Sequence, residues 1–359
     1  MTRLRCRRYP PVNAALIKEK AYELGVDLVG IAAAEHVPEA DRYREWLAQG
    51  FAADMSYLAR HRAKREDCRL LFPPARSVIV CGVSYHSSRT TALTSEAAAS
   101  ASHGLIARYA RGDDYHGVLK EKLTCLVEFL QHEIGSTLET KICVDTAPLL
   151  EKVYGKYAGL GWIGKHSCLI HPRYGSWFVL GEILINRDLE YDSPKTDRCG
   201  TCRRCLTACP TGALVAPGVL DARRCLSYLT IENTGSISEE FRSTMGTSVF
   251  GCDRCQEVCP WNHTADAPDH PAFLPRPQLE APDLDWLLAL SPETFLRIFR
   301  HSPIQRAKFQ GFMRNTAIAA GNAHNPALIP QLTALRRTSP SLVIPHIEWA
   351  LAQLTALQQ

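Results

Sequence analysis

Hydrophobic positions in residues 12–190 alternate between a helical and an extended pattern. Apolar residues recur every three or four positions in "YHGVLKEKLTCLVEFLQHEI" (residues 115–134), which predicts an amphipathic helix. Residues 13–24 predict a second helix that ends at Gly25. Apolar, β-branched runs predict strands at residues 28–32, 77–85, 140–145 and 175–186. This alternation of helices and strands predicts an α/β layered fold.

The rest of the chain follows other patterns. Residues 263–283 are rich in proline and predict an extended connector. From residue 284 the apolar spacing is helical, is broken at Asn325-Pro326 and Ser339-Pro340, and resembles a HEAT-type repeat. The predicted organisation is a basic tail (1–11), an α/β domain (12–190), a cysteine-rich module (191–262), the connector (263–283) and a helical region (284–359).

Composition sets limits on the class of protein. The chain has 359 residues, of which 46% are hydrophobic and 22% charged, as in a globular protein of two or three domains. Its net charge of +4 permits an anionic partner. The longest apolar runs, such as residues 178–185, are too short to span a bilayer, and residues 1–11 have no apolar segment behind them. We therefore expect a cytoplasmic monomer with no membrane helix and no secretory signal.

The cysteines carry the first sign of chemistry. Of fourteen cysteines, eight fall between residues 199 and 259, in "CGTCRRCLTACPTGAL", "RCLSYL" and "CDRCQEVCPW". The first of these runs has the spacing C-x2-C-x2-C-x3-C-P, which is typical of bacterial ferredoxins that bind [4Fe-4S] clusters. A zinc site needs only two C-x-x-C pairs, so it explains neither the extra cysteine nor the Cys-Pro ending. The pattern indicates metal ligation in a reduced compartment.

The spacing divides the eight cysteines between two clusters. In ferredoxins of this type, the cysteine before the proline ligates the other cluster. Cys259 therefore completes the first cluster, and Cys209 crosses to the second. The second run has one cysteine too few, and Cys225 is the nearby thiol that remains to supply it. The predicted ligand sets are Cys199, Cys202, Cys205 and Cys259 for the first cluster, and Cys209, Cys225, Cys252 and Cys255 for the second.

Residues 144–170 form a second informative segment. Asp145 ends a predicted strand, where α/β folds tend to hold catalytic groups, although a helix cap explains this position equally well. The stretch "GLGWIGK" (residues 159–165) matches neither the dinucleotide-binding pattern nor the P-loop pattern. We expect its glycines to let the backbone pass close to a large, flat ligand.

Six segments together resemble the epoxyqueuosine reductase family and come in the family's order: "VDTAPLLE", "GWIGK", "YGSWFVLGEIL", "CGTCRRCLTACPTGAL", "RCLSYLTIE" and "FGCDRCQEVCPWN". The resemblance implies a nitroreductase-like scaffold in the α/β domain, with cobalamin bound between this domain and a ferredoxin-like module. It also implies that an external low-potential donor sends electrons through the two [4Fe-4S] clusters to cobalamin.

The resemblance also implies roles for single residues. Asp145 would give a proton to the departing epoxide oxygen, if a nonpolar corrin face keeps it protonated. His116 begins a cobalt-ligand motif, but Leu119 replaces the glycine of that motif, so we expect a structural role or a substrate contact for His116. Without the resemblance, Arg65 in "RHRAKRED" would be interpreted as a surface charge. The implied cobalamin contacts are Arg65, Asp145, Leu169, Tyr174, Leu180, Ser227 and Asp253.

The predicted reaction is the reduction of epoxyqueuosine to queuosine at the wobble position of tRNA. The wobble base must leave its stack to reach the pocket, and the tRNA phosphates need basic partners. Candidate partners are Arg203, Arg204, Arg223, Arg224, Lys308, Arg314, Arg336 and Arg337. Three alternatives remain at this point: a cobalamin-dependent reductase of small molecules that resembles reductive dehalogenases, a simple electron carrier, and a zinc-stabilised RNA-binding protein.

Overall fold

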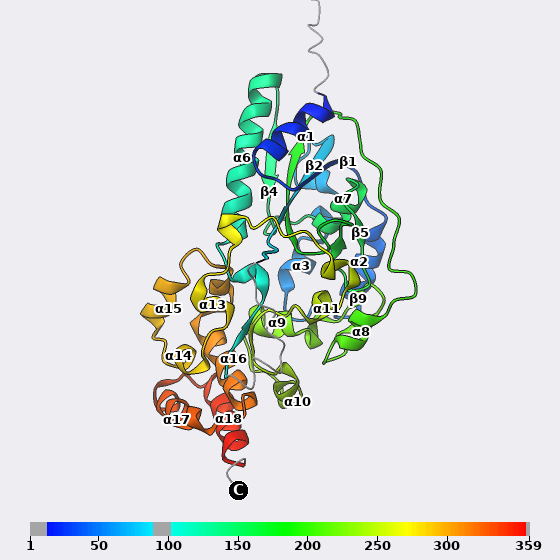
Figure 1. The fold of residues 1–359 in the computed structure, drawn as a ribbon. Helices are drawn as coiled ribbons and strands as arrows, with labels where there is room; N and C mark the ends of the chain where they lie inside the picture. Colours follow the sequence, from blue (N-terminus) through cyan, green and yellow to red (C-terminus); the bar gives the residue numbers. More distant parts are fainter. Residues whose placement is uncertain (1–12, 89–101, 357–359) are drawn as a thin grey trace, which may run out of the picture.

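The computed structural model describes residues 13–88 and 102–356 (Figure 1). The α/β layers lie at one end of an elongated molecule and the C-terminal helices at the other. The predicted basic tail lies outside the described residues. Within these two ranges, none of the helices combines the length and the apolarity that crossing a bilayer requires.

Four antiparallel strands form the central sheet in the order β1–β2–β7–β4. Because neighbouring strands run in opposite directions, β1 and β7 begin at the same end of the sheet at which β2 and β4 end. We call this end of the strands the site edge. All four strands were predicted, and their bounds are Leu28–Ala33 (β1), Ser77–Ser84 (β2), Thr140–Cys143 (β4) and Phe178–Ile185 (β7).

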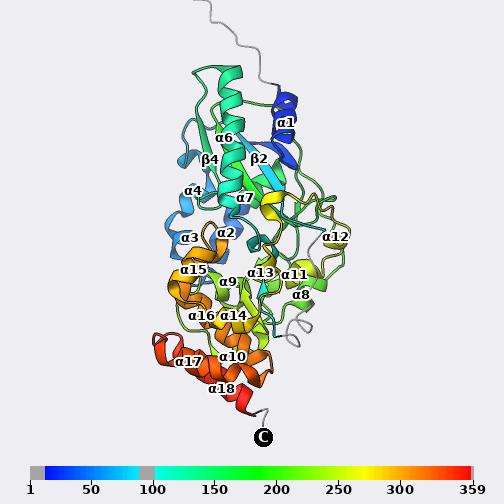
Figure 2. The same cartoon turned by 60° about the vertical axis from the view of Figure 1, so that its left-hand side comes forward.

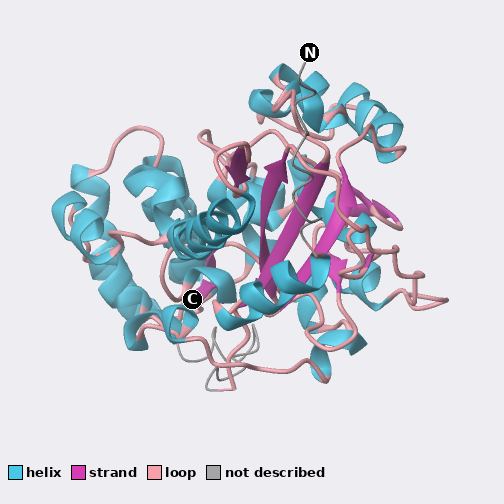
Figure 3. Ribbon diagram, turned by 90° about the horizontal axis from the view of Figure 1, so that it is seen from above, coloured by secondary structure: helices cyan, strands magenta, loops and turns pink. Residues whose placement is uncertain are grey.

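Helices cover both faces of the sheet, as Figure 3 shows. One face packs against α1 (Ala14–Glu23) and α6 (Tyr115–Ile134), and the other against α7 (Glu151–Tyr157). Asn13 caps α1, and Gly25 follows it with a φ of 75°, which glycine adopts without strain. The predicted α/β layering is therefore present, although the sheet is antiparallel.

Other short elements between the main ones were not predicted. The three helices after β1 bury only Ala40 and Arg65, so the sequence carries little hydrophobic periodicity there. A hairpin of two-residue strands follows α7 and is too short to show alternation. Their bounds are Glu39–Ala48 (α2), Ser56–Arg60 (α3), Arg62–Glu66 (α4), Trp162–Ile163 (β5) and Leu169–Ile170 (β6).

The cysteine-rich module does not begin and end as a separate unit. Its strand β10 pairs in parallel with β3 (Leu105–Ile106), which comes from the middle of the predicted α/β domain. The segment around β3 therefore packs with the later modules. The module's elements are Arg204–Ala208 (α8), Leu214–Ala216 (β8), Val219–Leu220 (β9), Leu226–Ile231 (α9), Glu239–Arg242 (α10), Ser248–Phe250 (β10), Arg254–Glu257 (α11) and Pro260–His263 (α12).

The C-terminal region is helical, as predicted, and stacks beneath the cysteine-rich module (Figure 2). Ile106 and Phe250 share one hydrophobic core with Leu284 and Phe312, so the predicted boundaries do not separate independent cores. The connector also departs from the prediction, because it forms a helical turn, α13. The helices are Pro277–Glu280 (α13), Leu284–Leu288 (α14), Pro292–Ile298 (α15), Lys308–Asn322 (α16), Ile329–Thr338 (α17) and Ile344–Ala356 (α18).

The contact between β1 and α7 gives a test of this packing. A Cβ at Gly30 would lie 1.9 Å from the carbonyl oxygen of Ala158. We expect Gly30→Ala to lower the free energy of unfolding by about 1–3 kcal/mol, because the strand or the helix must shift. Gly117→Ala is the control, since a Cβ at Gly117 would have no neighbouring atom within 4 Å and alanine favours a helix. Thermal melting checks both variants, and an unchanged midpoint for Gly30→Ala would contradict the close packing.

Candidate active site

Asp145 lies on the site edge, directly after β4. Its φ of 52° is in the left-handed region, which is uncommon for a residue with a side chain. The Asp145 N–H donates to Glu151 Oε1 at 2.5 Å, and this bond holds the turn. The next helix, α7, begins only at Glu151 and has no side-chain cap, so the helix-cap interpretation of Asp145 is wrong. The carboxyl is 55% exposed and can meet a ligand.

The start of α6 supplies the partners of this carboxyl. His116 Nε2 lies 3.3 Å from Asp145 Oδ2, and His116 Nδ1 lies 2.7 Å from Asp114 Oδ1. Hydrogen bonds to these two carboxylates, Asp114 first, raise the pKa of His116 to about 9. Desolvation raises the pKa of Asp145, but hydrogen bonds from His116 and Tyr115 outweigh it and keep that pKa below its usual value.

This geometry favours the proton of the pair on the imidazole, because a neighbouring cation stabilises the carboxylate form of Asp145. The expectation that a nonpolar corrin face keeps Asp145 protonated concerns the cofactor-bound site and stays a prediction. The role of His116 goes beyond the expected structural role or substrate contact. The side chain bridges two carboxylates, which makes it part of the acid group of the site.

Three further parts of the chain meet around Asp145. Arg306, in a 3-10 turn at Pro303–Ala307, acts electrostatically on the Asp145 carboxyl. The same guanidinium pairs with Glu232 at 2.9 Å and lies 5.9 Å from the centre of the Tyr57 ring. Glu232 follows α9 of the cysteine-rich module, and Tyr57 belongs to α3. The α/β layers, the cysteine-rich module and the C-terminal region therefore converge on one carboxyl.

A pair of carboxyl groups lies behind the Asp145 turn. Glu182 on β7 is fully buried, its two carboxyl oxygens have no hydrogen-bond partner within the protein, and the Glu151 carboxyl is its acidic neighbour. Two neighbouring carboxyls away from water cannot both be ionised. Burial and the neighbouring charge raise the pKa of Glu182 well above its usual value, and that of Glu151 to about 7. The pair therefore holds a proton while Glu151 accepts the hydrogen bond from the Asp145 backbone.

Arg65 is buried, with 8% of its surface exposed. Its Nη1 donates to the carbonyl oxygen of Leu149 at 3.2 Å, and its buried Nε has no hydrogen-bond partner within the protein. The interpretation as a surface charge is therefore wrong. A buried guanidinium with an unsatisfied donor favours a polar or anionic group beside it.

Three of the other predicted cofactor contacts share one hydrophobic cluster: Leu169, Tyr174 and Leu180, together with Leu149, whose carbonyl oxygen bonds to Arg65. Asp253 accepts a hydrogen bond from the Arg108 N–H at 2.7 Å. Ser227 lies on α9, two residues after Cys225.

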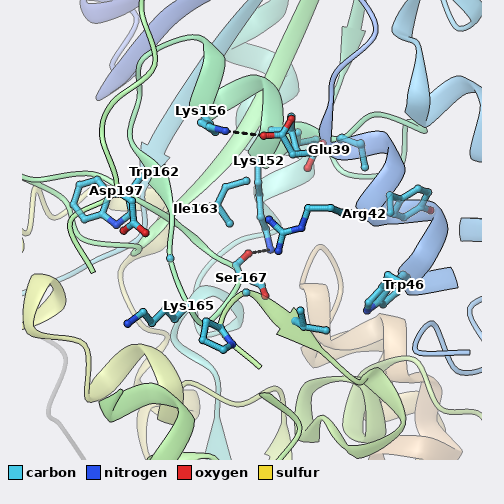
Figure 4. A pocket seen from close by; sticks show the side chains of 18 of the residues that line it. Glu39, Arg42, Trp46, Lys152, Lys156, Trp162, Ile163, Lys165, Ser167 and Asp197 are labelled. Carbon is cyan, nitrogen blue, oxygen red and sulfur yellow. Dashed lines mark hydrogen bonds and ion pairs between the residues drawn. The ribbon is translucent and has the colours of Figure 1, made fainter. Parts of the chain in front are cut away.

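A pocket of about 680 Å³ opens beside Glu151, at the start of α7 (Figure 4). Leu149, Leu150 and Val153 form part of its apolar wall, and Trp162 and Ile163 line it from the β5–β6 hairpin. Its cationic side chains differ in their partners. Lys156 pairs with Glu39 at 2.7 Å and Lys152 donates to the carbonyl oxygen of Ser167, whereas Arg42 extends toward the pocket centre. None of the seven predicted cofactor contacts lines this pocket, although Arg65 bonds to Leu149 in its wall.

The eight cysteines fall into two groups in space. Cys205 interacts electrostatically with Cys199, Cys202 and Cys259, and Cys225 with Cys209. Cys252 interacts with Cys225, and Cys255 with both. Cys168, which belongs to neither predicted set, is a further thiol neighbour of Cys255. The two ligand sets, with the crossing of Cys209 and Cys259, stay a prediction. In the described ranges no three His, Cys, Asp or Glu side chains converge on the position of a single metal ion.

Two glycines of "GLGWIGK" allow close packing within the protein. A Cβ at Gly161 would lie 2.0 Å from the Ile170 carbonyl oxygen, and one at Gly164 would lie 2.4 Å from the Ile170 side chain. These glycines let the two strands of the β5–β6 hairpin approach each other. Gly164 also lines the pocket, and the expected close approach to a flat ligand stays a prediction.

Three site features escaped the sequence analysis. Tyr115 and the pair of Glu151 and Glu182 lie in segments that have the pattern of ordinary amphipathic helix or buried strand. A glutamate in the otherwise apolar run "FVLGEILI" was the available signal for Glu182, because a buried charge needs a partner. Nothing in the sequence shows that this partner is another carboxyl.

Paired acid groups on an α/β layer, joined to two groups of four thiols, define the class as an iron–sulfur oxidoreductase. Residues 198–262 match the family model of the 4Fe-4S double cluster binding domain. Residues 65–146 match that of epoxyqueuosine reductase QueG, DUF1730. The first match supports [4Fe-4S] binding and gives no support to the zinc alternative.

Relatives along the whole chain give the particular family. The epoxyqueuosine reductase of Xanthomonas campestris is 40% identical over 98% of this chain and 99% of its own. The epoxyqueuosine reductase of Escherichia coli is 40% identical over 95% of this chain and 89% of its own. The solved epoxyqueuosine reductase of Bacillus subtilis, with its catalytic aspartate loop swung out of the active site, superposes with a TM-score of 0.85 at 32% identity, over 95% of this chain and 90% of that one. The chain belongs to the epoxyqueuosine reductase family.

The buried carboxyl pair predicts an unusual dependence of stability on pH. Between about pH 4.3, where an unfolded glutamate titrates, and pH 7, where Glu151 titrates, the folded protein binds more protons than the unfolded chain. Stability therefore falls as the pH rises through this window. Glu182→Gln keeps the shape and removes one titrating group, so we expect its melting temperature to vary less between pH 5 and 8 than that of the wild type.

The exposed Glu121 on α6 provides the control, since Glu121→Gln should leave the pH dependence of melting unchanged. Parallel melting curves for Glu182→Gln and wild type across this range would show that the pair does not share a proton.

Proposed function

We propose that this chain reduces epoxyqueuosine to queuosine in tRNA, with electrons passed through two [4Fe-4S] clusters to cobalamin. The observation that carries the proposal is the meeting of the Asp145–His116 acid pair with the cysteine-rich module on one edge of the sheet, in a chain of this family. A solved relative supports the choice of substrate. An epoxyqueuosine reductase in complex with an epoxyqueuosine-modified tRNA-Tyr stem loop matches 95% of this chain, with a TM-score of 0.78 and 31% identity.

The residues of the site fit the proposed cofactors. The two groups of four thiols suit one [4Fe-4S] cluster each. The unsatisfied Nε of Arg65 and the pocket with its apolar wall and Arg42 suit the amide groups and the phosphate of cobalamin. When bound, cobalamin would supply a cobalt centre as the reductant, and the clusters held by the cysteines would supply its electrons.

The acid pair explains how the epoxide oxygen leaves. Conversion of an epoxide to an alkene and water consumes two electrons and two protons. The oxygen leaves as an alkoxide unless it is protonated, and an alkoxide is a poor leaving group. Asp145 faces the open side of the site, and His116 stands behind it with a proton. We expect Asp145 to transfer the proton to oxygen while His116 replaces it, and Asp114 to stabilise the cationic imidazole.

The proposed tRNA contacts divide by burial. Arg314 is fully buried and donates to the carbonyl oxygens of Leu229 and Asn233, so its predicted role as a phosphate partner is wrong. Arg336 pairs with Glu348 at 2.6 Å and Arg223 with Asp221 at 2.7 Å, which weakens the case for each. The wider surface of the C-terminal helices remains the proposed tRNA platform. An external low-potential donor, a monomeric state and a cytoplasmic location remain part of the proposal.

The test of the function uses anaerobically purified protein loaded with clusters and cobalamin. We would incubate it with a strong reductant and tRNA that carries epoxyqueuosine, and measure the digested nucleosides by mass spectrometry. The proposal predicts the loss of one oxygen mass from the modified nucleoside. Fully loaded protein that leaves the nucleoside unchanged would overturn it and favour the small-molecule reductase.

In the same assay we expect Asp145→Asn to lower the single-turnover rate by about 10²- to 10⁴-fold, the usual contribution of a positioned acid. Asp113→Asn is the matched control, because Asp113 is an exposed aspartate beside Asp114 whose carboxyl pairs with Arg276 at 2.9 Å. Equal rates for Asp145→Asn and wild type would remove Asp145 from the acid role while leaving the reductase function intact.

The proposed ligand sets predict a selective loss of iron. Cys225→Ala should lose the second cluster and keep the first, so the iron content falls from about eight to about four per chain. Cys125→Ser changes an exposed cysteine on α6 and should keep all the iron. Iron analysis and electron paramagnetic resonance check both variants. A Cys225→Ala protein with two intact clusters would show that another residue completes the second set.

A further inference from the structure

Two buried N–H groups on the β5–β6 hairpin have no partner at hydrogen-bond distance and angle. They are Trp162 Nε1 and His166 Nε2, on side chains that are 2% and 5% exposed. Burying an N–H without an acceptor costs about 1–3 kcal/mol, so such a pair on one short hairpin requires an explanation.

The imidazole has its proton on the nitrogen that needs an acceptor. His166 Nδ1 accepts a hydrogen bond from the Cys168 backbone N–H at 3.1 Å. A nitrogen that accepts carries no proton, so the proton of the neutral ring is on Nε2. The tautomer is therefore fixed by the hairpin's own backbone, and Nε2 is a donor.

Both donors lie next to cysteines of the first proposed set. Trp162, Cys259 and Cys199 belong to one hydrophobic group with Ile170 and Trp261. Without a complete hydrogen bond, Trp162 lies beside the Cys199 thiol, and His166 lies beside the Cys168 and Cys259 thiols. The Lys165 backbone N–H also faces the Cys199 thiol. Sulfur is the acceptor that the surroundings offer to these donors.

The hairpin is fixed to the cysteine-rich module by a separate contact. Lys165 Nζ donates to the carbonyl oxygens of Gly200 and Cys202 at 2.5 and 2.8 Å. These bonds hold the hairpin loop over the first cysteine run. The side chain of Lys165 thus sets the distance at which the Trp162 and His166 rings meet the thiols.

We infer that the β5–β6 hairpin sets the reduction potential of the first cluster, through N–H donors from Trp162 and His166 to Cys199 and Cys259. Hydrogen bonds to the cluster sulfurs stabilise the reduced, more negative form, so they raise the potential. Cysteines of the second set are not among the thiol neighbours of the two rings, and the hairpin approaches that set through the Cys168 thiol beside Cys255. The hairpin thereby separates the potentials of two carriers that have the same kind of ligand. This inference rests on the ligand sets of the proposed function. Trp162 and His166 are positioning residues, because they touch the ligands and not the substrate.

The test is a redox titration, followed by electron paramagnetic resonance, of the loaded protein without substrate. His166→Phe and Trp162→Phe each keep a ring and remove an N–H. We expect each to lower the reduced-to-oxidised ratio of the first cluster about tenfold at a fixed potential, which is 59 mV for a one-electron couple. His166→Gln keeps a donor and should restore most of this loss. The second cluster should titrate as in the wild type.

Trp261→Phe is the packing control, since the Trp261 ring lies edge-on to Trp162 at 5.0 Å and the Cys199 and Cys259 thiols gain no donor from it. Cys225→Ala, which retains only the first cluster, identifies the signal. Unchanged potentials in both phenylalanine variants, or equal shifts of both clusters, would overturn the inference. If one variant fails to bind the clusters, the other decides. Two clusters in Cys225→Ala would instead refute the ligand sets.

Discussion

The antiparallel register of the four-stranded sheet is the constraint on which the site depends. It brings the ends of β2 and β4 to the same edge as the starts of β1 and β7. Asp145 follows β4 there, in a strained turn. The Glu151 carboxyl stabilises this turn by accepting a hydrogen bond from the Asp145 backbone N–H. Glu151 in turn lies beside the buried Glu182 of β7, and burial with the neighbouring charge raises the pKa of both carboxyls. The acid group therefore has a rigid support on one side and an open site on the other.

Electrostatics at this edge separates two kinds of acid. Asp145 remains ionised because His116 and Tyr115 donate to it, whereas the carboxyls behind it retain a proton because they are buried together. The proton for the epoxide oxygen is thus stored on an imidazole held between two carboxylates. The cysteine-rich module completes the site, since Glu232 after α9 holds Arg306 beside the same acid pair.

The sequence predicted what depends on local pattern. The four strands, α1 and α6 follow from apolar spacing, and the iron–sulfur character of residues 198–262 follows from cysteine spacing. It did not predict α2, α3 or α4, which bury little, nor the contact of β3 with β10, which are short, lie far apart in the chain and carry no periodicity. Pairings between distant side chains, such as Glu151 with Glu182, depend on the register of the sheet and cannot be read from spacing. The wrong interpretation of Arg65 has the same cause, because its exposed neighbours in the sequence concealed its burial.

The most direct test is anomalous diffraction at the iron and cobalt edges from crystals of the loaded, anaerobically purified protein. The account predicts one iron cluster at each of the two thiol groups and a cobalt peak beside the site edge, with the Asp145 carboxyl facing it. A cobalt peak far from Asp145, or iron at only one thiol group, would contradict the claim that this edge joins the acid pair to the electron carriers.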